Sequence, residues 1–129
     1  MDGLHLTADL RGCALAQPLM THPEALRRLC LAEVEAAGLR AVGELFHRFQ
    51  PTAAALAQVS GITGVVLLAE SHLAVHTWPE LGAVTLDVYV CNFGADNTGR
   101  AHRLFEALAL AFAPASMERH ALHRGQAGG

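Results

Sequence analysis

The chain has 129 residues, of which 52% are hydrophobic and 16% charged, which is typical of one folded domain. The formal net charge of −3 gives no electrostatic reason to expect a nucleic-acid partner. The sequence has no apolar run of about eighteen residues and no hydrophobic signal core near Met1, which argues against a membrane span. Three cysteines without a CxxC motif favour free thiols. Together these features predict a cytoplasmic protein.

The first half of the chain predicts a strand, a helix, a second strand and a loop. Residues 4–10 alternate apolar and polar side chains, as a half-buried strand does. Residues 21–24 have the spacing of a capping box with Thr21 as N-cap, and Gly38 is expected to end the helix. A strand is expected over residues 39–49, followed by an Ala-rich loop over residues 51–61.

The second half predicts mostly strands. These are expected over residues 65–68, 73–78, 84–91 and 116–124, with a turn at 79–82 and a helix that Asp96 or Asn97 caps and that runs through Phe112. The resulting order, β-α-β-β-β-β-α-β, predicts an α+β fold. We expect a two-layer α/β sandwich, in which two helices cover one face of a mainly antiparallel sheet. No repeat or boundary divides residues 1–129, so one domain is expected.

Residues 69–80, AESHLAVHTWPE, place a Glu-Ser pair and two histidines in an otherwise apolar strand. His72 and His76 are four residues apart and share a face of that strand. They are separated by about 13 Å along it, too far for both to bind one tetrahedral zinc ion. No metal site is therefore predicted. The absence of a GxSxG motif gives no support to a nucleophile–base triad.

Residues 70–80, ESHLAVHTWPE, resemble the self-cleavage segment of the prokaryotic S-adenosylmethionine decarboxylase proenzymes. Residues 3–6 (GLHL), 46–49 (FHRF) and 87–91 (DVYVC) resemble three further strands of that family. The likeness covers most of the chain, and the run at 70–80 is long enough to be specific. The resemblance implies a decarboxylase of polyamine biosynthesis that forms its own prosthetic group.

The resemblance implies cleavage of the Glu70–Ser71 bond, giving a β chain (residues 1–70) and an α chain (residues 71–129). The Ser71 hydroxyl would attack the Glu70 carbonyl, and Ser71 would end as a pyruvoyl group. His76 matches the residue that transfers a proton during processing, a task suited to an imidazole. Thr63 stands where the family often has a serine that supports the developing oxyanion.

The pyruvoyl group implied by the resemblance replaces pyridoxal phosphate and forms a Schiff base with an amino-acid-type substrate. Cys91 matches the family's proton donor, since a thiol is mostly protonated at neutral pH. Phe49 resembles the aromatic residue that stacks on adenine, and Glu80 the carboxylate that binds the ribose. The resemblance also implies a dimer of cleaved protomers in which both contribute to each active site.

Three departures from the family pattern leave the substrate open. Residues 50–60 form a longer segment than usual, residues 92–99 (NFGADNTG) replace a cysteine–glycine and an acidic stretch, and Leu81 replaces an aromatic residue. A pyruvoyl-dependent ornithine or arginine decarboxylase is therefore an alternative, although Phe49 and Glu80 favour S-adenosylmethionine. A non-catalytic regulatory paralogue is a further alternative, disfavoured because the sequence keeps the matching Ser, His and Cys. No role is assigned to His72.

Overall fold

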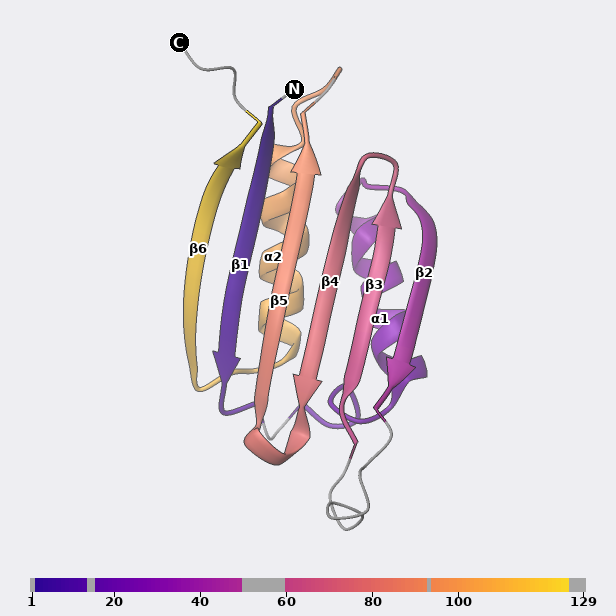
Figure 1. The fold of residues 1–129 in the computed structure, drawn as a ribbon, viewed down its shortest axis with the longest axis vertical. Helices are drawn as coiled ribbons and strands as arrows, with labels where there is room; N and C mark the ends of the chain where they lie inside the picture. Colours follow the sequence, from indigo (N-terminus) through magenta and orange to yellow (C-terminus); the bar gives the residue numbers. More distant parts are fainter. Residues whose placement is uncertain (1, 14–15, 50–59, 93, 126–129) are drawn as a thin grey trace.

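The structure, a computed structural model, describes residues 2–13, 16–49, 60–92 and 94–125. Most of the predicted loop at 51–61, and most of the long segment at 50–60, lie outside these residues. The elements occur in the predicted order (Figure 1). They are β1 (Gly3–Arg11), α1 (Pro23–Ala36), β2 (Ala41–Arg48), β3 (Ile62–Leu68), β4 (Ser71–Trp78), β5 (Ala83–Cys91), α2 (Thr98–Ala111) and β6 (Ser116–Arg124).

The strands form one sheet in the order β2-β3-β4-β5-β1-β6, and every neighbouring pair is antiparallel. Figure 1 shows both helices on the same side of this sheet, with α1 behind β2 and β3 and α2 behind β5 and β1. The predicted two-layer α+β fold is confirmed. Within the described residues, neither helix has the length and apolar character needed to cross a membrane.

Alternating burial along the strands separates a helix-covered face from an open face. In β4, Leu73, Val75 and Thr77 are buried under the helices, whereas His72, Ala74, His76 and Trp78 are partly accessible on the other side. The helices contribute their apolar stripes to the same core, which includes Leu26, Cys30, Val34, Leu104, Phe105 and Leu108. We call the sheet surface away from the helices the open face.

The start of α1 differs from the capping box predicted for residues 21–24, and that prediction was wrong. His22 is the N-cap, with φ −112° and ψ 105°, and its side chain makes no capping hydrogen bond. The Thr21 hydroxyl instead donates to Gln17 Oε1 at 3.0 Å. Because proline disfavours helical backbone in the residue before it, His22 cannot be the first helical residue and the helix begins at Pro23.

The end of α1 and the start of α2 agree with the sequence. Gly38, with φ +82°, follows α1, and the Leu39 N–H donates to the Val34 carbonyl at 3.0 Å, which closes the last turn. Asn97 is the N-cap of α2, and Phe112 is its C-cap. The end of α1 and the start of α2 lie beside the same end of the sheet (Figure 1), and both contribute residues to one pocket there.

Strand bounds shift where backbone pairing continues beyond the apolar run. β3 starts at Ile62 rather than at residue 65, and its first N–H donates to the Thr77 hydroxyl at 2.9 Å. Thr77 is fully buried and donates in turn to the Met20 carbonyl at 2.8 Å. β4 starts at Ser71 rather than at residue 73, so Ser71 is the first residue of a paired strand.

Candidate active site

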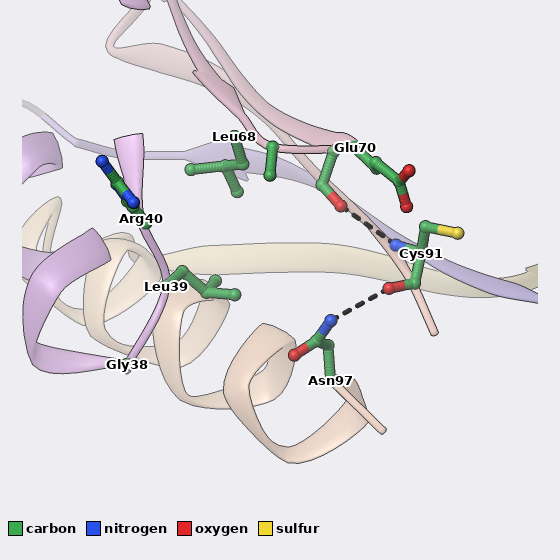
Figure 2. A pocket seen from close by; sticks show the side chains of 9 residues that line it. Gly38, Leu39, Arg40, Leu68, Glu70, Cys91 and Asn97 are labelled. Atoms are coloured by element: carbon green, nitrogen blue, oxygen red, sulfur yellow. Dashed lines mark hydrogen bonds between the residues drawn. The ribbon is translucent and has the colours of Figure 1, made fainter. Parts of the chain in front are cut away.

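A pocket of about 440 Å³ lies at the end of the sheet where β3 meets β4 and β5 ends. It is lined by Gly38, Leu39, Arg40, Leu68, Ala69, Glu70, Ser71, Cys91 and Asn97. Figure 2 shows Leu68 and Glu70 on one side, with Leu39 and Asn97 on the other. The pocket therefore brings together three residues that the sequence singled out: Glu70, Ser71 and Cys91.

The Glu70–Ser71 bond lies in the tight turn that joins β3 to β4. Leu68 pairs with Ser71 across the hairpin, so Ala69 and Glu70 are its two turn residues. Both turn residues are exposed, whereas Ser71 is half-buried. Two-residue hairpin turns tightly constrain the backbone between the strands. The turn thus presents the Glu70 carbonyl and the Ser71 hydroxyl at the pocket wall, beside the end of β5.

The backbone of Cys91 holds the Ser71 hydroxyl. The Cys91 N–H donates to Ser71 Oγ at 3.0 Å (Figure 2). The last backbone pair between β4 and β5 is His72 with Tyr89, so Cys91 has no backbone partner in β4. Its N–H bonds instead to a side chain of β4, that of Ser71. This hydrogen bond brings the Ser71 hydroxyl beside the residue that carries the Cys91 thiol.

The three cysteines differ in their surroundings. Cys13 and Cys30 are fully buried in the core, and burial raises the pKa of both thiols, that of Cys30 to about 12. Cys13 and Cys30 therefore remain neutral, packed side chains. Cys91 is 7% exposed and is the only cysteine among the described residues that lines the pocket. Cys91 is thus the cysteine that lines the same pocket as Ser71.

A second group of predicted residues lies at the other end of the sheet. Thr63 in β3 pairs with His76 in β4, and Thr63 Oγ1 lies 3.3 Å from His76 Nδ1. The Trp78 ring stacks on the His76 ring with centroids 5.9 Å apart. Because all three side chains project from the open face, the hydroxyl and the imidazole form one polar unit there. Sequence analysis did not identify Trp78 as part of this unit.

Phe49 and Glu80 belong to this second end. The Phe49 N–H donates to the Gly61 carbonyl at 2.9 Å, just beyond β2. Glu80 is exposed on a short 3-10 helix, Pro79–Leu81, that follows β4. Figure 1 shows that β2 and β4 both finish at the end of the sheet opposite the β3–β4 turn. The predicted site residues therefore divide into two sets at opposite ends of one sheet.

Ser71 and His76 do not meet within one chain. His76 lies five positions after Ser71 in the same strand, a separation of about 17 Å at about 3.3 Å per residue. Side chains alternate along a strand, so residues five apart project from opposite faces. Ser71 has the parity of the helix-facing Leu73, whereas His76 projects from the open face. Contact between the Ser71 hydroxyl and a His76 imidazole requires a second copy of the chain.

His72 joins a cluster of rings on the open face. Its ring centroid lies 5.6 Å from that of Tyr89 and 6.4 Å from that of His5. Burial, partly offset by Asp87, lowers the pKa of His5 below its usual 6.5. Arg124 Nη1 lies 3.3 Å from His5 Nδ1 and favours the neutral ring as an acceptor. The His72 side chain thus lies on the face opposite the pocket.

Asn97 is a pocket residue that sequence analysis identified only as a helix cap. Its Nδ2 donates to the Cys91 carbonyl at 2.9 Å (Figure 2). The only signal in the sequence was its position just before the helix, which carries no information about Cys91. Within the described residues, no group of three or more His, Cys, Asp or Glu side chains is arranged to hold a metal ion.

The chain is similar to known decarboxylases over nearly its whole length. The family model described as S-adenosylmethionine decarboxylase matches residues 4–125. The S-adenosylmethionine decarboxylase proenzyme of Archaeoglobus fulgidus is 34% identical over 123 residues, covering 95% of this chain and 97% of that protein. The proenzyme of Aquifex aeolicus is 35% identical over 123 residues, which is 95% of this chain and 81% of that protein.

A solved structure agrees with the sequence relatives. The crystal structure of the adenosylmethionine decarboxylase from Aquifex aeolicus matches with a TM-score of 0.80 and 34% identity, covering 98% of this chain and 92% of that chain. The sheet architecture and these matches lead to the same result. The chain belongs to the S-adenosylmethionine decarboxylase family.

Proposed function

We propose that this chain is a proenzyme that cleaves itself between Glu70 and Ser71, and that the cleaved protein decarboxylates S-adenosylmethionine. The observation that carries the proposal is the hydrogen bond from the Cys91 N–H to Ser71 Oγ, at 3.0 Å. It joins the serine of the scissile bond to the residue matching the family's proton donor. The relatives that cover most of the chain are named as S-adenosylmethionine decarboxylase proenzymes.

Self-cleavage uses groups that the β3–β4 turn brings together. The Ser71 hydroxyl attacks the Glu70 carbonyl carbon, the bond from that carbon to the Ser71 nitrogen breaks, and the hydroxyl proton passes to the nitrogen. An ester thus replaces the peptide bond, and Ser71 gains a free amine. Loss of the Ser71 Cα proton then expels the Glu70 carboxylate and leaves a dehydroalanine. Addition of water releases ammonia and leaves a pyruvoyl group at the start of the α chain. The Cys91 N–H donates to the Ser71 hydroxyl oxygen and so orients the hydroxyl before it attacks.

The pyruvoyl group would withdraw electrons from the substrate's α-carbon as carbon dioxide leaves. Ser71, its precursor, fits this role because it begins a paired strand and faces a pocket. The Cys91 side chain, which lines the same pocket as Ser71, would supply a proton to the substrate carbon. Leu39 and Leu68 are apolar residues that line this pocket as well.

The active enzyme is proposed to contain two copies of the chain. Each copy has Ser71 and Cys91 at one end of its sheet and Thr63 and His76 at the other. Two sheets packed through their open faces in opposite directions would bring the His76 of one copy to the end of the sheet where the Ser71 backbone of the other copy lies. The open face carries apolar side chains suited to burial, including Leu45 at 68% and Leu67 at 49% exposure.

His76 would then remove the Ser71 Cα proton of the other copy, and Thr63 would support the oxyanion formed at Glu70. The 3.3 Å contact between Thr63 Oγ1 and His76 Nδ1 keeps these two groups together as they approach the partner. Phe49 and Glu80 lie at the same end of the sheet as His76. They would approach the partner's pocket with it, as an adenine platform and a ribose acceptor.

The cytoplasm is the proposed location of the protein.

Two measurements on one preparation test the proposal. Intact mass should show two chains, ending at Glu70 and beginning at a pyruvoyl group in place of Ser71. Carbon dioxide should then be released from S-adenosylmethionine and not from ornithine or arginine. Ser71→Ala should stay as one chain, while Ser116→Ala, on the exposed β6, should cleave normally. Cleavage of Ser71→Ala, or release of carbon dioxide from ornithine or arginine alone, would overturn the proposal.

A further inference from the structure

Asn97 connects the start of α2 to the end of β5 through a set of hydrogen bonds. Its backbone N–H donates to Asn92 Oδ1 at 2.8 Å, and its Nδ2 donates to the Cys91 carbonyl at 2.9 Å. Arg100 Nη1 donates to Asn97 Oδ1 at 2.9 Å. The side-chain amide thus has a different partner at each end.

These partners allow only one orientation of the Asn97 amide. The guanidinium of Arg100 can only donate, and the carbonyl of Cys91 can only accept. A flipped amide would place a donor against Arg100 and an oxygen against the Cys91 carbonyl, so both bonds would be lost. The Arg100 side chain also passes close to the end of α1, since a Cβ added at Gly38 would lie 3.2 Å from Arg100 Nε. The orientation of the amide is therefore set by its two partners, Arg100 and the Cys91 carbonyl.

Cys91 is held on both sides of its α-carbon. Its N–H donates to Ser71 Oγ at 3.0 Å, and its carbonyl accepts from Asn97 at 2.9 Å. The next residue is also anchored, since the Asn92 N–H donates to the Asp2 carbonyl at 2.7 Å. With the peptide groups before and after the Cys91 α-carbon both fixed, the direction of its Cα–Cβ bond is fixed as well.

We propose that Asn97 is a positioning residue for both reactions of this protein: through the Cys91 backbone it sets the Ser71 hydroxyl for self-cleavage and the Cys91 thiol for proton transfer. This inference rests on the function proposed above. Small displacements of reacting groups slow enzymatic steps strongly. Loss of the Asn97 donor frees the Cys91 carbonyl, and both the N–H that holds Ser71 and the thiol then shift.

The segment that supplies Asn97 is where this chain departs from the family pattern noted at residues 92–99. In this chain the loop is closed by its own side chains, because Asn92 Oδ1 accepts from the Asn97 N–H and Asn92 Nδ2 lies 3.4 Å from Thr98 Oγ1. Asn97 therefore has two roles: it occupies the N-cap position of α2, without a side-chain capping hydrogen bond, and its side chain holds the end of β5. The test must separate these roles.

Asn97→Asp separates them. The Asn97 side chain makes no capping hydrogen bond, so aspartate removes no cap, and its carboxylate keeps the contact with Arg100; the folded state should therefore retain its thermal midpoint. Aspartate has no donor for the Cys91 carbonyl and places an oxygen against it. We expect self-cleavage of Asn97→Asp to be about tenfold slower, the size of one lost hydrogen bond. In protein that has cleaved, kcat should fall by a similar factor while KM changes less than about twofold.

Asp96→Asn is the matched control, because Asp96 Oδ1 accepts from the Thr98 N–H at the same helix end but lies outside the pocket. It should cleave at the wild-type rate. Asn97→Ala, which also lacks the donor, should behave like Asn97→Asp in cleavage. Wild-type rates of cleavage and turnover in Asn97→Asp, with a cleaving wild type, would overturn the inference alone. A wild type that never cleaves would instead overturn the proposed function.

Discussion

The Cys91 backbone N–H donates to the Ser71 hydroxyl at 3.0 Å, across twenty residues of sequence. The donor is the last residue of β5 and the acceptor is the first residue of β4, so the bond continues the sheet by one side chain. The intact chain therefore already holds the scissile serine against the residue proposed to donate a proton later. The proposed self-cleavage and decarboxylation would therefore use one prearranged end of the sheet.

Co-expression of two variants that cannot cleave alone should show whether one active site is shared between two copies of the chain. Ser71→Ala and His76→Ala should each fail to cleave alone, because one lacks the nucleophile and the other the base. Mixed by co-expression, the Ser71→Ala copy supplies His76 to the copy that retains Ser71. Intact mass should then show that only the His76→Ala chain is cleaved. Absence of cleavage in the mixture, with both chains folded and associated, would contradict a shared site.

Cys91→Ala should separate processing from turnover. Because Ser71 is held by the Cys91 backbone and not by its thiol, cleavage should continue at close to the wild-type rate. Loss of the proton donor should lower kcat by about 10²-fold or more, a typical contribution of general acid catalysis. Cys30→Ala is the control: it removes a buried thiol from the core, so it should lower the thermal midpoint while keeping cleavage and turnover. An unchanged kcat in Cys91→Ala would exclude the thiol as donor.

Gly61→Ala should destabilise the end of the sheet that carries His76. A Cβ at Gly61 would lie 2.0 Å from the Thr77 carbonyl oxygen, a backbone atom that cannot move without breaking the sheet. Overpacking of this kind costs about 1–3 kcal/mol in the free energy of unfolding. Gly99→Ala provides the comparison, because no atom lies within 4 Å of its added Cβ and alanine favours helix. Denaturant unfolding should show Gly99→Ala at or above wild-type stability.

His5 should make stability depend on pH between neutrality and mild acid. Its folded-state pKa is lowered from 6.5, chiefly by burial, with Asp87 raising it and Arg124 and His72 lowering it further. The unfolded chain therefore binds more protons than the folded one as pH falls below 6.5, so acidification reduces the free energy of unfolding. Thermal midpoints measured from pH 7 to pH 5 should fall less steeply in His5→Gln.

The matched control is His123→Gln, which removes a histidine from the exposed strand β6 instead of from the ring cluster around His5. Equal slopes in wild type and His5→Gln would show that the burial of His5 does not contribute. Each sample should be kept at one protein concentration, because association through the open face would also stabilise the folded state.

The sequence by itself determined the element order and marked the candidate site residues. Alternation in residues 4–10 and 84–91 and the helical spacing before Gly38 were sufficient, because the side-chain period follows directly from backbone geometry. The run at residues 70–80 marked the scissile bond through its resemblance to a family. The capping box failed because the sequence pattern at Thr21 ignored the constraint that Pro23 places on His22.

Only the tertiary structure decided how these residues are grouped. A linear motif places His76 five residues from Ser71, yet strand alternation and length put their side chains on opposite faces and far apart. Conversely, Ser71 is twenty residues from Cys91 and meets it because antiparallel pairing sets the end of β5 beside the start of β4. Asn97 joins them because the start of α2 lies against the end of β5. Which side chains share a site depends on strand register and helix placement, and these follow from packing across the whole domain.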